Sequence, residues 1–226
     1  MIYWLLVSIL AYLFFALASL GDKLILDGRT QGAPQPKSYT FYIGVFSIFV
    51  ILLIPFIKFG VPDASGFMWI ALDAFVYIIG LYTMFVALER FDVSKVIPTI
   101  GATQPIFIFI LTWIFWGPQV MPAIDILAFI LLFIGSIIIS IEKNIGVTGD
   151  FLKITILSSL MFSLDYIFSK SVFLNQPFLQ GIIWIRIFVF FFVLAFLLTK
   201  KSREEIFAKK MVESKKTQIL FLYAQA

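Results

Sequence analysis

The chain contains seven apolar segments of about 20 residues, and this feature constrains its fold more than any other. A helix needs roughly 20 apolar residues to cross a bilayer, where main-chain amides must be hydrogen-bonded within the protein. The sequence therefore predicts an all-α, polytopic helical membrane protein. The predicted spans are residues 2–26, 39–57, 67–88, 96–116, 123–141, 151–174 and 178–199.

An eighth apolar segment begins at Thr217 and ends with the chain at Ala226, after about ten residues, which is too short to cross a bilayer. We therefore expect about seven complete spans and the start of an eighth, in a chain truncated at its C-terminal end. Glycine and proline residues, which mark loops, lie between the spans at the positions where hydropathy also predicts loops. The first segment is interpreted as a span rather than a signal peptide, because no Lys or Arg precedes it.

The composition excludes several kinds of chemistry. Only 13% of the residues are charged, whereas soluble domains have about 25%. The chain has no cysteine and no histidine, which removes disulfides, thiolate nucleophiles and the commonest metal ligand. We predict no catalytic residues, no metal site, no cofactor and no enzymatic activity. The net charge of +4 is concentrated in one loop, which indicates membrane orientation and not a nucleic-acid partner.

An internal repeat is indicated when Lys23 is placed over Lys170. Six of the 20 ungapped positions from Ile9 to Gly28 are then identical, and intramembrane lysine is rare enough to be informative. Five spans precede the second unit, so that unit enters the membrane from the opposite face. The sequence thus predicts inverted five-span repeats, the first in residues 1–147 and an incomplete second in 148–226.

A run of motifs beginning near the end of the third predicted span resembles the drug/metabolite transporter superfamily, specifically the EamA type with a five-plus-five arrangement. The motifs are Ala87-Leu88-Glu89-Arg90-Phe91-Asp92-Val93-Ser94-Lys95-Val96-Ile97-Pro98, then Gln104-Pro105-Ile106-Phe107, Gly117 and Gly135-Ser136. The Gly-Glu turn of the family reads Gly117-Pro118 here, so its acidic residue is missing. The resemblance implies a ten-span carrier whose last two and a half spans are absent.

Basic residues are distributed unevenly between the two faces. Thirteen lie in loops of one face, including the segment 200–216, and only Lys58 lies in a loop of the other. The positive-inside rule predicts that the 200–216 loop is cytoplasmic and the N-terminus external, in a cell (plasma or inner) membrane. The family resemblance implies cytoplasmic termini, and we follow the charges. The 200–216 segment is interpreted as a solvated orientation signal in preference to a surface helix.

Charged residues inside the predicted spans are the first candidates for a solute pathway. Asp165 and Arg186 lie about 12–14 Å from the same membrane face, so an ion pair between them is allowed. That pair either lines a polar cavity or fixes the packing of two helices. Lys170 and Lys23 lie nearer helix ends, where snorkelling is an alternative to solute binding. Asp73 and Asp125 lie near predicted span starts, where water and the helix dipole stabilise them.

The fourth predicted span carries a second group of candidates. Pro105 lacks an N–H and frees the carbonyl of Gly101, which predicts a kink. Gln104 and Thr103 are expected to bind solute or to satisfy the kink. Two aromatic residues with polar atoms, Tyr77 and Trp184, are candidates for stacking on a solute, with packing as the alternative.

Taken together, these patterns predict a secondary carrier that moves a small metabolite or drug-like solute by alternating access. Its expected partners are the lipid bilayer and that solute, and a homodimer is left open. Two alternatives remain: a membrane-embedded enzyme acting on lipid-linked substrates, and a non-transporting structural membrane protein. The sequence indicates neither the solute nor the coupling ion.

Overall fold

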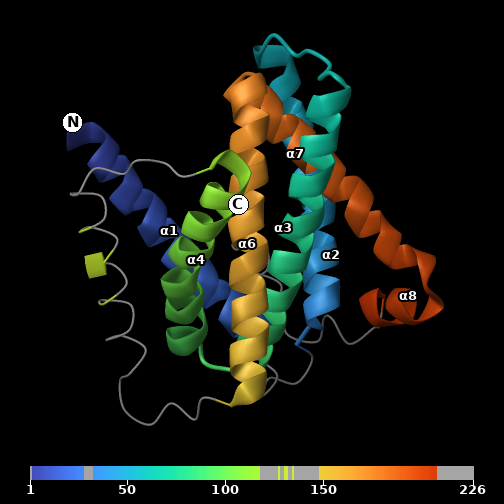
Figure 1. Ribbon diagram of the computed structural model, residues 1–226. Coiled ribbons are helices and arrows are strands. Elements are labelled where there is room, and N and C mark those ends of the chain that lie inside the picture. The colour runs from blue at the N-terminus through green and yellow to red at the C-terminus, as the bar shows by residue number, and fades with distance from the viewer. Residues whose placement is uncertain are drawn as a thin grey trace.

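The computed structural model describes residues 2–27, 33–117 and 148–207, together with Leu127, Ile130, Leu131 and Ile134. In this part of the chain all regular secondary structure is helical, and six helices are long and apolar enough to cross a membrane (Figure 1). The elements are α1 (Ile2–Leu26), α2 (Pro36–Phe46) with the 3₁₀ helix η1 (Ser47–Phe56), α3 (Ala64–Arg90), α4 (Val93–Trp116), α6 (Gly149–Asn175), α7 (Phe178–Leu194) with the 3₁₀ helix η2 (Ala195–Leu198), and α8 (Lys200–Ile206).

The prediction of an all-α polytopic membrane protein is confirmed at this level, and six of the predicted spans each match one long helix. The predicted fifth span, 123–141, falls mostly outside the described residues, and its four described positions are helical. The predicted eighth span, which begins at residue 217, lies wholly outside them. The total number of spans and the repeat therefore stay predictions.

Three helices begin one turn earlier than hydropathy predicts, at Pro36, Ala64 and Val93. Their first turns carry polar or charged residues, which an apolar window leaves out. At α3 the first turn is capped by Asp63, whose carboxylate accepts a 2.8 Å hydrogen bond from the Gly66 amide. This bond, with one from the Ser65 hydroxyl, holds the pKa of Asp63 below its usual value.

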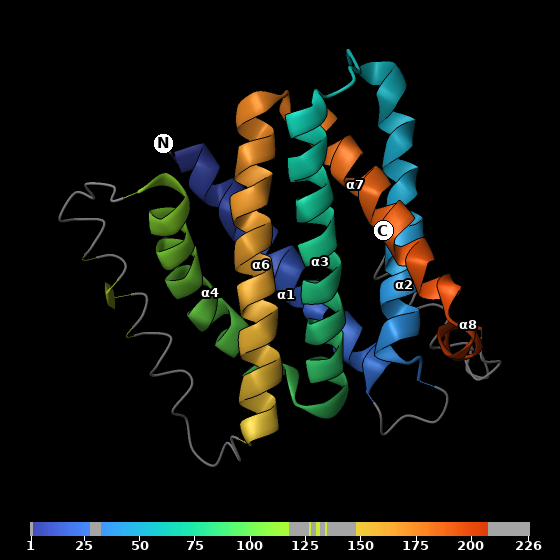
Figure 2. The same ribbon diagram turned by 45° about the vertical axis from the view of Figure 1, so that its right-hand side comes forward.

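Helix α6 lies at the centre of the bundle, with α3 on one side and α4 on the other (Figure 2). Its buried hydroxyl residues allow close approach and bond to neighbouring main-chain carbonyls. Ser158 donates to the Gly80 carbonyl of α3 over 3.1 Å, and Ser163 donates to the Gln104 carbonyl of α4 over 3.1 Å. A Cβ atom at Gly80 would lie 3.1 Å from the Phe162 ring. Small residues and interhelical hydrogen bonds, which drive helix association in lipid, therefore hold this interface together.

A second packed group joins α2, α3 and α7. A Cβ atom at Gly44 of α2 would lie 2.4 Å from a methyl group of Val193 on α7, so these backbones approach too closely for any larger residue. Buried Ile70 and Ala74 of α3 and Val189 of α7 belong to the same apolar cluster. This group brings α7 against α3 on the side facing away from α4 (Figure 2).

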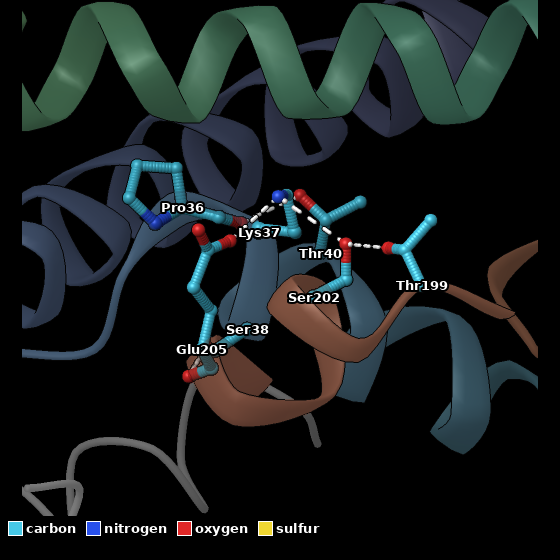
Figure 3. Close-up of polar contacts among 7 residues, drawn as sticks. All are labelled: Pro36, Lys37, Ser38, Thr40, Thr199, Ser202 and Glu205. Atoms are coloured by element: carbon cyan, nitrogen blue, oxygen red, sulfur yellow. Dashed lines mark hydrogen bonds and ion pairs between the residues drawn. The ribbon is translucent and has the colours of Figure 1, made fainter. Parts of the chain in front are cut away.

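The segment 200–207 is a docked helix and not the solvated loop that we predicted. Ile206 of α8 is fully buried in the α2–α3–α7 cluster. Lys37 at the start of α2 pairs with Glu205 at 2.5 Å, and the Ser38 hydroxyl donates to the Glu205 carbonyl over 2.9 Å (Figure 3). Burial of Ile206 and the pair with Lys37 stabilise this docking, while the lysines of α8 remain exposed on its other face. Residues 208–216 lie outside the described part.

Candidate functional site

Three charged residues on three different helices lie at one depth in the bundle. Asp73 of α3 and Arg186 of α7 follow the starts of their helices, and Asp165 of α6 precedes the end of its helix, each by roughly eight to ten residues. At 1.5 Å per residue the three side chains lie about 12–15 Å below the same end of the bundle. We call Asp73, Asp165 and Arg186 the charged cluster.

Asp73 is the most deeply buried member, with no exposed surface. Its Oδ1 atom accepts a 2.8 Å hydrogen bond from the Ser169 hydroxyl of α6. Its Oδ2 atom is also buried, and no hydroxyl, amide or cationic donor among the described residues bonds to it. The carboxyl of Asp165 lies within hydrogen-bonding reach of Asp73. Burial of a carboxylate oxygen without a hydrogen-bond donor costs free energy. The approach of the Asp165 carboxyl to Asp73 therefore needs a chemical explanation.

Arg186 supplies the positive charge of the cluster. Its guanidinium lies near enough to act on the charges of both carboxyls, and it sits 4.8 Å from the centre of the Tyr77 ring. The predicted ion pair between Asp165 and Arg186 does not form within a nitrogen–oxygen distance of 4.0 Å. The ion pairs found within 4.0 Å in the described part of the chain join Lys23 to Asp27, Lys37 to Glu205 and Lys95 to Asp92.

An open pocket of about 300 Å³ lies on the surface of α6, toward the end of that helix. Ser169 lines this pocket and also bonds to Asp73, so one hydroxyl connects the pocket to the most buried carboxyl. Lys170 lines the pocket as well, with its ammonium 4.6 Å above the Trp116 ring of α4. The pocket walls are mostly apolar, and Tyr166, Phe173 and Leu174 complete them.

The structure brings together some of the predicted site residues and separates others. Asp165 and Arg186 belong to the charged cluster, Tyr77 lies under the Arg186 guanidinium, and Lys170 lines the neighbouring pocket. Lys23 lies elsewhere, where its ammonium donates a 2.7 Å hydrogen bond to the Leu88 carbonyl and pairs with Asp27.

Trp184 serves packing and loop anchoring. Its indole N–H donates to the Gly60 carbonyl over 2.9 Å, and its ring stacks on Phe59 at 5.3 Å. The Gly60 amide donates in turn to the Gln180 side chain over 3.1 Å. Gln180 and Trp184 of α7 therefore hold the loop between η1 and α3 by the amide and the carbonyl of Gly60. For Trp184 this is the packing role that we gave as the alternative to solute binding.

The α4 candidates lie on the other side of α6 from the charged cluster. Helix α4 continues through Pro98 and Pro105. The Thr103 hydroxyl donates to the Thr99 carbonyl over 2.9 Å, so it bonds one turn back rather than to Gly101. The Gln104 carbonyl accepts from Ser163. Thr103 and Gln104 thus contribute to the joint between α4 and α6, and the structure does not place them in the cluster.

Sequence reasoning missed two residues of this site, Asp73 and Ser169. We expected Asp73 near the start of a span, in contact with water, but α3 begins earlier and carries it deeper. One signal could have found it: when the helix start is taken from the Asp63 cap, Asp73 reaches the same depth as Asp165 and Arg186. Ser169 carries no comparable signal, since serines are common throughout α6.

Comparison of the sequence with models of known protein families gives no match. A search among curated proteins likewise gives no match.

Proposed function

We propose that the protein is a secondary carrier for a small solute and that the charged cluster lies on its transport pathway. The observation that carries this proposal is the placement of two carboxyls and a guanidinium at one depth between three membrane-spanning helices. Charged side chains at that depth are costly in hydrocarbon, and in membrane proteins they mark ion and solute pathways. A purely structural bundle has no need of them.

The helix directions support the same proposal. Helices α1 and α6 run in opposite directions through the bundle, and so do α2 and α7 (Figures 1 and 2). Inverted repeats require this relation between the first and second helices of each unit. The pairing of Lys23 with Lys170 and the resemblance to EamA-type carriers suggest the same plan. The charged cluster combines α3 of the first unit with α6 and α7 of the second, so a movement between units would reshape it.

Cysteine accessibility tests this proposal, and the natural chain has no cysteine to interfere. Cysteine would replace Asp165 and Arg186 singly, and a membrane-impermeant thiol reagent would be applied to intact cells. The matched control is Leu72→Cys, which lies next to Asp73 on α3 and points outward with 37% of its surface exposed.

Labelling at 165 and 186, with no labelling at 72, is the expected result, because a carrier keeps water in its pathway and lipid against its outer surface. If neither cluster position reacts, the bundle is dry at this depth. The charges would then have a packing role, and the carrier proposal would fail.

A further inference from the structure

We propose that Asp73 and Asp165 together form a binding site for one exchangeable proton. The inference rests on the proposed function, because it names the ion whose gradient the carrier uses. It concerns a site formed by α3 and α6, which lie side by side along most of their lengths (Figure 2).

The hydrogen bonding of Asp73 indicates a shared proton. This side chain is fully buried, and its Oδ2 atom has no donor among the described hydroxyls, amides and cations. The Asp165 carboxyl lies within hydrogen-bonding reach. Two carboxylates have only acceptor atoms and repel each other, whereas a carboxylic acid beside a carboxylate donates an O–H···O bond. One shared proton therefore explains both the contact and the absence of another donor.

The charge of the surroundings also favours one proton on the pair. Arg186 is the cation that faces the two carboxyls from α7, and its guanidinium lies 4.8 Å from the centre of the Tyr77 ring of α3. From α6 the neighbouring group is the Ser169 hydroxyl. With one proton on the pair the cluster is neutral, and without it one negative charge is left over. The cation of α6 near this end of the bundle, Lys170, lies over the Trp116 ring.

The carboxyl pair is also connected to the pocket on α6. A buried site exchanges protons only if a hydrogen-bonded group connects it to water. The Ser169 hydroxyl donates to Asp73 and also lines the pocket of about 300 Å³ near the end of α6. On release the O–H bond of the protonated carboxyl breaks, the Ser169 oxygen accepts that proton while passing its own to water in the pocket, and the pair is left as two carboxylates.

A proton fits this site better than a metal cation. Hard cations need six or more oxygen ligands. The described residues supply two carboxyls and one hydroxyl that already donates to Asp73. In addition, the guanidinium of Arg186 would repel a cation placed between the carboxyls.

Infrared difference spectroscopy tests the proposal without any knowledge of the solute. The purified full chain in lipid nanodiscs would be titrated with hydroxide, while the C=O stretching band of protonated carboxyls is recorded in water and in D₂O. We expect one band, equivalent to one carboxylic acid per chain, which shifts in D₂O and disappears as the pH rises. Asp73→Asn and Asp165→Asn should each lose this band near neutral pH, because the remaining carboxylate pairs with Arg186.

Two controls keep the result interpretable. Asp150→Asn in the first turn of α6 removes an exposed carboxyl and should leave the band unchanged. Ser169→Ala keeps both carboxyls, so the band should persist while its exchange in D₂O becomes slower. This variant also covers the case in which an asparagine variant fails to fold.

The proposal would be overturned if the natural chain lacked the band, or if the band survived in both asparagine variants. A band that sodium chloride removes and N-methylglucamine chloride does not would also overturn it, in favour of a metal cation. If the band titrates but the cysteines at 165 and 186 stay unlabelled, the proton site would stand and the carrier proposal would be refuted. Labelled cysteines without the band would refute the proton site alone.

Discussion

The ammonium of Lys23 donates a 2.7 Å hydrogen bond to the main-chain carbonyl of Leu88, which ties the end of α1 to the end of α3. The last carbonyls of a helix have no partner within it, and a cation nearby also interacts favourably with the helix dipole. Lys23 therefore acts as a cap supplied by another helix. The sequence repeat pairs this residue with Lys170, which has a different partner, the Trp116 ring.

Replacing these two lysines should separate their roles. Lys23→Met removes a charge-assisted hydrogen bond and the pair with Asp27, so it should lower the free energy of unfolding by roughly 1–3 kcal/mol. Lys170→Met removes an exposed cation–π contact, and should cost about 0.5–1 kcal/mol. Unfolding in detergent mixtures, followed by circular dichroism, measures both. Equal effects of the two substitutions would contradict the capping role.

Gly80 should not tolerate a branched side chain at the joint between α3 and α6. Gly80→Val places atoms against the Phe162 ring, which already lies 3.1 Å from an ideal Cβ position, so stability should fall by about 1–3 kcal/mol. The matched control is Gly101→Ala in α4, where no atom lies within 4 Å of the added Cβ. That change should be neutral or stabilising by up to about 1 kcal/mol, because alanine favours a helix. The same unfolding measurement decides the comparison, and a harmless Gly80→Val would show that α3 and α6 are packed loosely.

The ion pair between Lys37 and Glu205 should hold α8 against α2. Each side chain is partly exposed, so the pair is expected to contribute on the order of 1 kcal/mol. A double-mutant cycle with Lys37→Met and Glu205→Gln measures this coupling, which should decrease in high salt. Exchange of the two charges, K37E with E205K, should restore part of it. A coupling energy of zero would mean that buried Ile206 and the Ser38 hydrogen bond position α8 without the ion pair.

Asp63 should stabilise the start of α3 in a pH-dependent manner. Its pKa in the folded protein is lowered from 3.8 by the Gly66 amide and the Ser65 hydroxyl. The stabilisation is therefore fully present above pH 3.8 and is lost as the pH falls through the folded pKa. Asp63→Ala should lower the melting temperature at neutral pH, and this difference should shrink at a pH below 3.8.

The Asp63→Asn variant serves as the control for that titration. An asparagine caps a helix at any pH, so its melting temperature should stay near that of the natural chain at neutral pH. If the difference between the natural chain and Asp63→Ala were the same at both pH values, the carboxylate of Asp63 would not be the group that caps α3.

Much of the fold was predictable because hydropathy alone requires long helices. Boundaries were less accurate at Pro36, Ala64 and Val93, where polar first turns hide the helix start. That error of one turn also placed Asp73 too near the surface. The docking of α8 was missed because one buried isoleucine among many charges gives a weak pattern, whereas the partners of that helix lie on α2, far away in the sequence.

The candidate site was predictable only in part. Equal depth along two helices predicts that Asp165 and Arg186 lie near each other. The structure adds that Asp73 lies beside Asp165 and that Tyr77 lies under Arg186. Depth along a helix can be counted from the sequence, but the direction in which a side chain points depends on how helices are rotated. For this reason Gln104 and Thr103 were grouped with the site, although they lie on the opposite side of α6.

The measurement that tests the carrier proposal most directly is two-sided labelling of Ser169→Cys, a nearly isosteric change at the pocket on α6 that this serine connects to the charged cluster. The thiol reagent would be applied separately to right-side-out and inside-out vesicles, with Leu72→Cys as the lipid-facing control. An alternating carrier predicts that position 169 reacts from both sides, because the site opens to each face in turn. Reaction from one side only, at every pH and salt concentration, would contradict alternating access and leave a pocket that opens to a single face.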